Sequence, residues 1–307
     1  MYVARSMGWF AALFILITSA SKCSATPTMY LPWRTGLTIR CTQGNNQSGG
    51  HYDHTGQIAY AFDFGLPAGE PIKASAPGTV SVLADGGNYN GGWGNYVIIN
   101  HCDGTYSLYA HMQTGSISSV IRNGQQIQQG QPIGRCGSTG NSTGAHLHIQ
   151  VMRAGASNAQ TIPFSFAEVG VPRENDNVTS NNMALAEIGD GMLVQPFGRG
   201  EVYITVGGAK LHIPSANEFN AMGYSWANIK VGPTSLISNL PNIPRGGTMI
   251  KYRSYDAVWV VLSFNGTYYR WHLMSPAAVN RFGGFGAVSV IPNGSADNIP
   301  FSGIDIW

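Results

Sequence analysis

Two histidines separated by a single residue could carry out chemistry together. They lie in Gly137–Val151, which opens as a loop of Gly, Ser, Thr and Asn and continues as an alternating segment that favours a β-strand. Side chains two apart on a strand share a face, so we expect His146 and His148 side by side, with Leu147 and Ile149 facing a core. Such a pair can bind a metal ion, or one histidine can bind it while the other works beside it. The alternative is a pair of surface histidines on an edge strand.

An aspartate in an apolar strand is the next candidate. In Ala59–Phe64 the aromatic side chains of Phe62 and Phe64 share one face, and Asp63 points to the other. A carboxylate in so apolar a strand must be paired, hydrogen-bonded or bound to a metal, although an aspartate in a turn or cap is the simpler interpretation.

Two more histidines precede and follow this aspartate. His54 lies in the polar segment before it, and His111 ends the predicted strand Thr105–Met112, where it should share a face with Tyr109. His111 could also be a hydrogen-bonded histidine of the core. We expect His101 to be solvated or structural.

These residue types fit a catalytic zinc site. Such a site takes three nitrogen or oxygen ligands from the protein and keeps a fourth position for water, whose pKa falls to about 7. Two imidazoles and one carboxylate suffice as ligands, and the two remaining histidines could orient the water, move its proton and stabilise an oxyanion. The chain has no HExxH motif, so a histidine has to replace the glutamate base of that peptidase class.

Three segments together resemble the lysostaphin and β-lytic (LytM-like) type of zinc metalloendopeptidase. They are Ala59–Val80 (AYAFDFGLPAGEPIKASAPGTV), Gly94–His111 (GNYVIINHCDGTYSLYAH) and Gly130–Val151 (GQPIGRCGSTGNSTGAHLHIQV). The resemblance implies one Zn²⁺ per chain, bound by His54, Asp63 and His148. It also implies that His111 and His146 are the catalytic histidines that do not bind the metal.

The position of the first ligand departs from the commonest family pattern. That pattern has a histidine four residues before the aspartate, whereas His54 precedes Asp63 by nine residues (63 − 54 = 9). A wider gap occurs in some branches, including the β-lytic one, so a loop can supply this ligand. His51 is the alternative.

The surrounding sequence predicts a mainly β fold. Asn95–Cys102 and Thr105–Met112 are apolar runs joined by Asp103-Gly104, a strong hairpin signal, and no amphipathic helix of useful length interrupts the catalytic segments. The family resemblance adds a curved antiparallel sheet, with the site in a groove between loops.

The N-terminus has the pattern of a secretory signal. Met1–Ala25 combines Arg5, a short apolar run and small residues. Its removal also deletes Lys22, which leaves 15 basic residues (17 − 2) against 15 acidic ones. A neutral secreted protein gives no reason to expect nucleic acid or, after signal removal, a membrane as partner.

Export permits disulfide bonds. We expect Cys102 to pair with Cys136, because both border the catalytic segments, and Cys41 to be single or joined to Cys23. Spacing alone leaves other pairings open.

A repeat distinguishes the C-terminal part. Val202-Tyr203-Ile204 recurs as Val258-Trp259-Val260 and Asn242-Ile243-Pro244 as Asn298-Ile299-Pro300, each 56 residues later (258 − 202 and 298 − 242). Lys210-Leu211-His212-Ile213 is echoed by Arg270-Trp271-His272-Leu273, which makes His212 and His272 architectural in our interpretation. Aromatic residues such as Tyr268, Tyr269 and Trp271 would suit a binding module if they are exposed, and a plain structural pairing of the two units is the alternative.

We therefore predict a signal peptide (1–25), a zinc peptidase domain (26–172), a linker (173–183) and a C-terminal domain of two strand-rich repeats (184–307), which could bind cell walls. The expected activity is that of a secreted, monomeric zinc endopeptidase, which hydrolyses peptide bonds in the cross-links or stem peptides of bacterial peptidoglycan. A non-catalytic relative that regulates wall hydrolases and a carbohydrate-binding adhesin are the alternatives.

Overall fold

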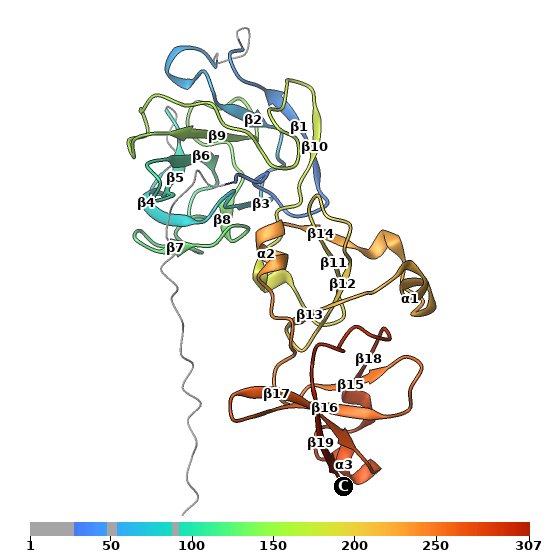
Figure 1. The fold of residues 1–307 in the computed structure, drawn as a ribbon. Helices are drawn as coiled ribbons and strands as arrows, with labels where there is room; N and C mark the ends of the chain where they lie inside the picture. The colour runs from blue at the N-terminus through green and yellow to red at the C-terminus, as the bar shows by residue number, and fades with distance from the viewer. Residues whose placement is uncertain (1–27, 48–53, 88–91) are drawn as a thin grey trace, which may run out of the picture.

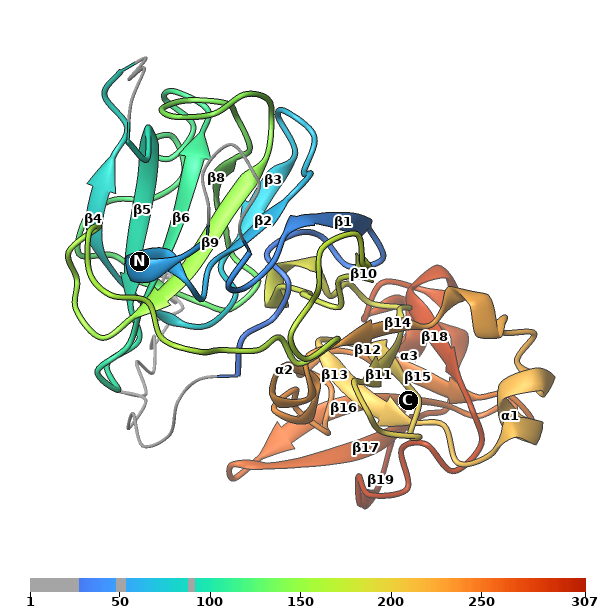
Figure 2. The same ribbon diagram turned by 90° about the horizontal axis from the view of Figure 1, so that it is seen from above.

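The computed structural model describes residues 28–47, 54–87 and 92–307 (Figure 1). The expected signal segment, Cys23 and His51 lie outside these ranges. One large sheet dominates the N-terminal part, and two smaller sheets make up the C-terminal part (Figure 2). No helix within the described ranges is long and apolar enough to cross a bilayer.

The large sheet has eight strands, and each neighbouring pair is antiparallel. The predicted antiparallel, mainly β fold is therefore confirmed. In spatial order the strands are β10 (Asn177–Thr179), β1 (Thr38–Gln43), β2 (Phe62–Phe64), β9 (Leu147–Met152), β6 (Tyr106–Met112), β5 (Asn95–Asn100), β4 (Gly78–Ala84) and β7 (Gln126–Ile127). A separate two-stranded sheet pairs β3 (Pro71–Lys73) with β8 (Pro132–Arg135).

One face of the large sheet carries the main core. Leu147, Ile149 and Val151 of β9 pack there with Phe62 and Phe64 of β2, and all five are almost fully buried. Alternation along each strand sends the intervening side chains to the opposite face, and the register sets Asp63 directly across from His148. The predicted faces of β2 and β9 are thus confirmed.

The β5–β6 hairpin forms at the predicted turn. Asp103 accepts hydrogen bonds from the backbone and hydroxyl of Thr105, and Gly104 has φ of +86°. His101 beside it is buried, with its ring nitrogens 2.7 Å from the carbonyl oxygen of Pro77 and 2.9 Å from the hydroxyl of Ser107. It is structural and not solvated.

The expectation that Tyr109 and His111 share a face is wrong. Tyr109 belongs to the main core, and its hydroxyl accepts a hydrogen bond from the backbone of Ser75. Opposite Asn95 and Val97 the pairing slips, so β6 carries an extra residue, and His111 adopts a φ of +61°. Because a bulge interrupts alternation, the imidazole turns to the face that bears His148.

The expected disulfide between Cys102 and Cys136 is also wrong, since both cysteines are free. Cys102 is exposed at the turn end of β6, whereas Cys136 is buried and pairs with Met112 at the other end of that strand. A strand of this length spans about 20 Å, while a disulfide needs Cα atoms within about 7 Å. Cys41 is free and buried.

The polar segment expected as a linker includes a strand of the large sheet. β10 pairs with β1, Val178 joins the main core, and Ser180 and Asn182 are fully buried. Lys73 of β3 is only 2% exposed. Its Nζ atom donates to the carbonyl oxygen of Asn182 at 3.1 Å and to Oε1 of Glu187 at 2.5 Å. These contacts tie residues that follow β10 to the N-terminal part.

The C-terminal part contains the predicted pair of strand-rich repeats. In each, three strands form an antiparallel meander and a fourth returns parallel to the first. The first repeat consists of β11 (Leu193–Pro196), β12 (Tyr203–Val206), β13 (Ala209–His212) and β14 (Lys230–Gly232); the second consists of β15 (Met249–Tyr252), β16 (Val258–Phe264), β17 (Thr267–Leu273) and β18 (Val288–Ile291), with β19 (Phe301–Ile306) added beside β17.

Short helices fill equivalent places in the two repeats. A serine caps the α-helix after the third strand in both, Ser215 before α1 (Ala216–Ala221) and Ser275 before α3 (Pro276–Asn280). The 3₁₀ helices η3 (Trp226–Asn228) and η4 (Phe285–Ala287) then lead into the parallel strands. The remaining helices are η1 (Gly56–Ile58), η2 (Leu185–Glu187) and α2 (Thr234–Ser238).

The repeat aromatics that could suit a binding module differ in exposure. Tyr268 is 37% exposed, whereas Tyr269 and Trp271 are half-buried, and Trp271 packs against the core of the second repeat.

Candidate active site

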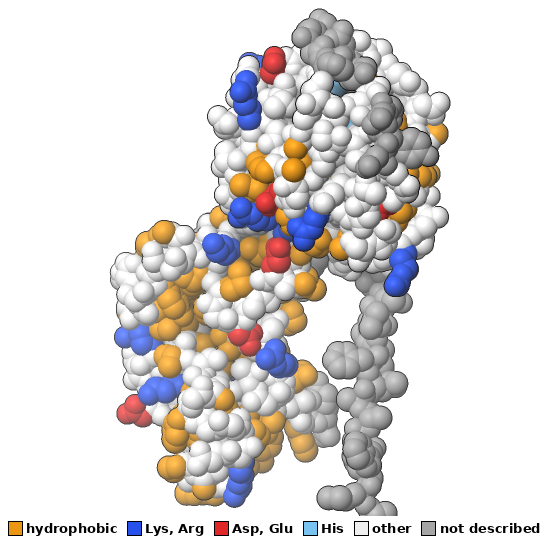
Figure 3. Space-filling model, turned by 180° about the vertical axis from the view of Figure 1, so that it is seen from behind, with side chains coloured by type: hydrophobic (Ala, Val, Ile, Leu, Met, Phe, Trp, Pro, Cys, Tyr) orange, Lys and Arg blue, Asp and Glu red, His pale blue; other side chains and the backbone are white. Residues whose placement is uncertain are grey.

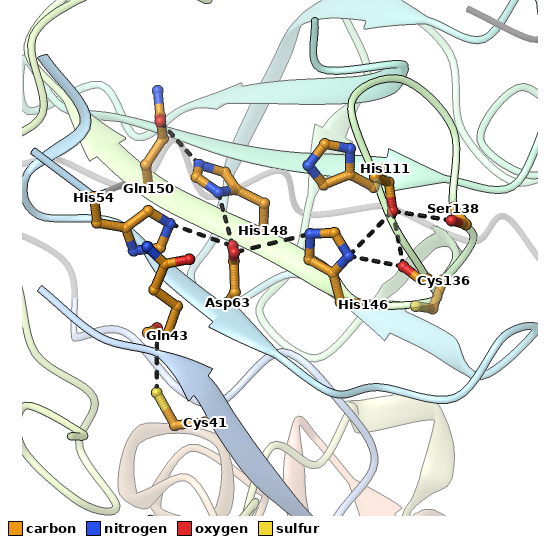
Figure 4. A network of polar contacts seen from close by, with 12 residues as sticks. Cys41, Gln43, His54, Asp63, His111, Cys136, Ser138, His146, His148 and Gln150 are labelled. Carbon is orange, nitrogen blue, oxygen red and sulfur yellow. Dashed lines mark hydrogen bonds and ion pairs between the residues drawn. The ribbon is translucent and has the colours of Figure 1, made fainter. Parts of the chain in front are cut away.

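Asp63 lies at the centre of a cluster of histidines (Figure 4). Its Oδ1 atom is 2.9 Å from Nδ1 of His148 and 3.5 Å from Nε2 of His54, and its Oδ2 atom is 3.8 Å from Nε2 of His146. The sheet register supplies Asp63 and His148, and the segment just before η1 supplies His54. Residues separated by as many as 94 positions (148 − 54) therefore meet around one carboxylate.

Three of these side chains can hold one metal ion. A single ligand atom from each of His54, Asp63 and His148 lies within 4.8 Å of the other two, and among the described residues no other group of this kind occurs. His54 Nδ1 lies 3.0 Å from the carbonyl oxygen of Gly44, and His148 Nε2 lies 3.0 Å from Oε1 of Gln150. With a metal bound, each proton would stay on the outer nitrogen that faces its acceptor, and the inner nitrogen would bind the metal. Two imidazoles and one carboxylate fit zinc.

The charge state of Asp63 suits a metal ligand. Burial alone raises the pKa of its carboxyl, but hydrogen bonds and favourable electrostatics from His148 and His54 outweigh burial and hold the pKa well below its usual range. The carboxylate is therefore ionised at neutral pH.

His111 stands beside this cluster in a strained conformation. Its Nδ1 atom is 2.8 Å from the carbonyl oxygen of Thr139, and its ring centroid is 4.5 Å from that of His146. A φ of +61° is unusual for histidine and is retained because the surrounding contacts impose it. Burial, followed by repulsion from His148 and His146, lowers the pKa of His111 to about 4, so the ring is neutral near pH 7.

His146 is oriented from the other side. Its Nδ1 atom lies 2.9 Å from the carbonyl oxygen of Gly144 and 3.2 Å from the hydroxyl of Ser142. The Nε2 atom consequently faces the cluster, and Figure 4 shows both His111 and His146 on the same side of Asp63.

A glycine-dependent contact holds the loop that orients these two histidines. Thr139 accepts a hydrogen bond from the backbone of Asn95 and donates one to the carbonyl of Met112. A Cβ at Gly140 would lie 2.3 Å from the backbone nitrogen of Gly94, so only glycine permits this approach.

The cluster opens into a groove of about 530 Å³. Besides the four histidines and Asp63, the walls include Gln43, Ile58, Trp93 and the loop 141–145. Trp93 packs its ring 4.8 Å from that of His148. All five predicted site residues therefore line one groove, whereas Tyr109 and His101 do not; His51 lies outside the described residues.

The groups that orient the site were not predicted from the sequence. Gln150 could have been found, because it lies two residues after His148 on the same strand face. The roles of Trp93, Thr139 and the carbonyl of Gly44 had no local signal, since each depends on packing between distant segments.

Comparison with known proteins places the site in a family. The model of peptidase family M23 matches residues 57–160, which include Asp63, His111, His146 and His148 but not His54. Lipoprotein NlpD of Yersinia enterocolitica is 40% identical over 89 residues, which make up 29% of this chain and 84% of the relative. The chain belongs to peptidase family M23.

Other M23 relatives are much longer than the matched region. The DD-carboxypeptidase/endopeptidase Mpg of Neisseria meningitidis is 37% identical over 97 residues, 32% of this chain and 20% of the relative. The peptidoglycan DD-endopeptidase ShyC of Vibrio cholerae is 35% identical over 117 residues, 37% of this chain and 25% of the relative. The chain thus spans only a fifth to a quarter of the length of these two proteins.

Two solved structures are also similar to part of this chain. A catalytic-domain variant of the prophage-encoded M23 protein EnpA from Enterococcus faecalis is 27% identical, with a TM-score of 0.35, and covers 43% of this chain and 94% of its own. The catalytic domain of lysostaphin from Staphylococcus simulans is 26% identical, with a TM-score of 0.30, and covers 41% and 88%.

Proposed function

We propose that this M23 protein is a secreted zinc endopeptidase that hydrolyses peptide bonds in the cross-links or stem peptides of bacterial peptidoglycan. One observation carries the proposal: His54, Asp63 and His148 converge within 4.8 Å, with His111 and His146 beside them on the same groove. The name of the Vibrio relative, a peptidoglycan DD-endopeptidase, supports the choice of substrate, and the name of the Neisseria relative supports an endopeptidase. We further propose one zinc ion per chain and a monomeric enzyme.

When bound, zinc would polarise the scissile carbonyl group and lower the pKa of a water molecule. The chain's own residues supply the rest. His111 and His146 each point Nδ1 at a backbone carbonyl oxygen, so each leaves Nε2 free. In the neutral ring this atom accepts a proton from the attacking water, and once protonated it donates to the oxyanion. The carbonyl acceptors hold both rings in the required tautomer.

The groove suits an extended peptide of low charge. Apart from Asp63 and the histidines, none of its described lining residues is ionisable, and glycines at positions 65, 92 and 144 leave room for a backbone to approach. A non-catalytic regulator would have no need of a complete ligand set with two oriented histidines, and we therefore favour the enzyme.

Zymography on purified cell walls tests the proposal. We expect lysis by the wild-type protein, loss of lysis with a chelator and recovery with added zinc. Lysis that persists in chelator would contradict the zinc mechanism, and wall binding without lysis would select the regulator or the adhesin. Mass spectrometry of the products then identifies the bond cleaved.

The first metal ligand needs its own test. We expect His54→Ala to lose bound zinc, because it removes a donor atom next to Asp63, and His51→Ala to retain it. Metal analysis of the two purified variants distinguishes them, and the reverse pattern would assign the ligand to His51.

A further inference from the structure

A second hollow, of about 510 Å³, lies in the first C-terminal repeat. Its walls come from the segment before β12, the end of β13, α1 and η3, and they include Glu201, His212, Phe219 and Trp226. The hollow belongs to the C-terminal part and shares no lining residue with the M23 site.

An aromatic platform forms one wall of the hollow. The rings of Trp226 and Phe219 stack with centroids 4.0 Å apart and planes inclined by 26°. Phe219 is 1% exposed, whereas Trp226 is 54% exposed. One face of the indole is thus supported by the core and the ring still presents a large open surface, which fixes it rigidly for contact with a flat ligand. Figure 3 shows further hydrophobic side chains over the visible face of the C-terminal part, between a few charged ones.

Polar groups lie beside this platform. Glu201 is exposed and forms no hydrogen bond or ion pair with the residues that the structure describes, so its carboxylate can accept from a ligand. His212 is exposed at the end of β13, with its ring 5.5 Å from that of Tyr203, and its imidazole can both donate and accept.

The second repeat lacks this combination. Phe285 occupies the place of Trp226, at the start of the 3₁₀ helix before the parallel strand, and is 60% exposed. Four positions after the capping serine, the second repeat has Val279 where the first has Phe219. Just before the Val-aromatic motif, the second repeat has Ala257 where the first has Glu201. His272 lies 3.4 Å from Asp305 of β19, which covers the strand edge that β13 leaves open.

We propose that the hollow in the first repeat binds a sugar ring of a glycan strand. The indole of Trp226 would stack on the apolar face of a pyranose, while Glu201 and His212 would hydrogen-bond to its hydroxyl or N-acetyl groups. A hydroxyl-rich ring offers both the donors that a carboxylate needs and the acceptors that an imidazole can use. Glu201 would repel the carboxylates of an acidic stem peptide, which favours the glycan over the peptide part of the wall.

The choice of peptidoglycan as the source of the glycan rests on the proposed function, but the binding test does not. The whole chain carrying Asp63→Asn, which we expect to be unable to degrade the wall, is mixed with glycan strands stripped of their peptides and, separately, with soluble stem peptides. We expect binding to the glycan strands and none to the peptides. Binding confined to the peptides would overturn the proposal, and so would binding to neither ligand.

The two repeats supply matched variants in the same background. We expect Trp226→Ala to weaken glycan binding at least tenfold, Trp226→Phe to retain most of it, and Phe285→Ala to leave it unchanged. Equal losses for Trp226→Ala and Phe285→Ala, or no loss for Trp226→Ala, would overturn the proposal. Thermal unfolding of each variant shows whether the first repeat is intact, and binding that fails in a stably folded Trp226→Phe variant also counts against it. If the wild-type protein does not lyse cell walls, that result contradicts only the proposed peptidase function and leaves the glycan-binding proposal standing.

Discussion

Histidines face neighbouring strands in both parts of the molecule, with different consequences. In the repeats, His212 and His272 lie directly across from Tyr203 and Trp259, one histidine to one ring. In the M23 part, four histidines gather around the single carboxylate of Asp63. Each cross-strand pair follows directly from the register of two neighbouring strands. The cluster around Asp63 forms only because the β6 bulge, the segment before η1 and strands β2 and β9 meet. Convergence therefore distinguishes the site, and histidine content does not.

The largest difference in zinc binding and lysis should come from substitutions of Asp63 and Asp305, which both face histidines. We expect Asp63→Asn to abolish zinc binding and reduce wall lysis at least ~1000-fold, because it removes a charged ligand from the centre of the cluster. Asp305→Asn, which removes the carboxylate beside His272, should change neither quantity. Zinc analysis and lysis assays on both variants measure this. Comparable losses of zinc and lysis in Asp63→Asn and Asp305→Asn would show that the Asp63 cluster and the His272–Asp305 pair do not differ in function.

Substitutions of His111 and His272 compare a proposed catalytic histidine with an architectural one. We expect His111→Ala to retain zinc but to lower activity by about 100-fold to 10,000-fold, since a group that transfers protons is lost while the metal ligands remain. His272→Ala should leave activity unchanged. Loss of zinc from His111→Ala would reassign His111 as a ligand.

Glycine packing gives the next effect. Gly140→Ala should push the loop that carries Thr139 away from Gly94, misplace His111 and lower activity roughly 100-fold with zinc retained. Gly86→Ala is the control, because a Cβ there meets no described residue within 4 Å and the backbone is not left-handed. Lysis assays and metal analysis of both variants provide the test. Full activity in Gly140→Ala would mean that the loop tolerates displacement.

The smallest effect concerns the cysteines. Cys102→Ser should leave the melting temperature unchanged, because Cys102 is exposed and forms no disulfide. In protein without residues 1–25, a thiol reagent should label Cys102 rapidly, while Cys41 and Cys136 react only after unfolding. Burial is the largest cause that raises the pKa of the Cys41 and Cys136 thiols to about 12, so neither forms the reactive thiolate near neutral pH. A lower melting temperature on reduction of the native protein would restore the disulfide hypothesis.

Much of the arrangement could be predicted from local patterns. Alternation identified the faces of β2 and β9, and an Asp-Gly pair identified the β5–β6 turn. The recurring Val-aromatic and Asn-Ile-Pro motifs identified the two repeats. The polar composition of 173–183 gave no sign of β10, because β10 is a short edge strand with only Val178 facing the core.

By itself, the sequence identified candidate metal-binding residues, the strand faces that bear Asp63 and His148, and the repeat in the C-terminal part. Only the tertiary structure decided that His111 turns from the core toward Asp63, that Cys102 and Cys136 lie at opposite ends of β6, and that Trp226 stacks on Phe219. The physical reason is the range of the forces involved. Side-chain alternation and turn preference act over a few residues, whereas bulges, loop packing and ring stacking depend on contacts between segments that the chain sequence separates.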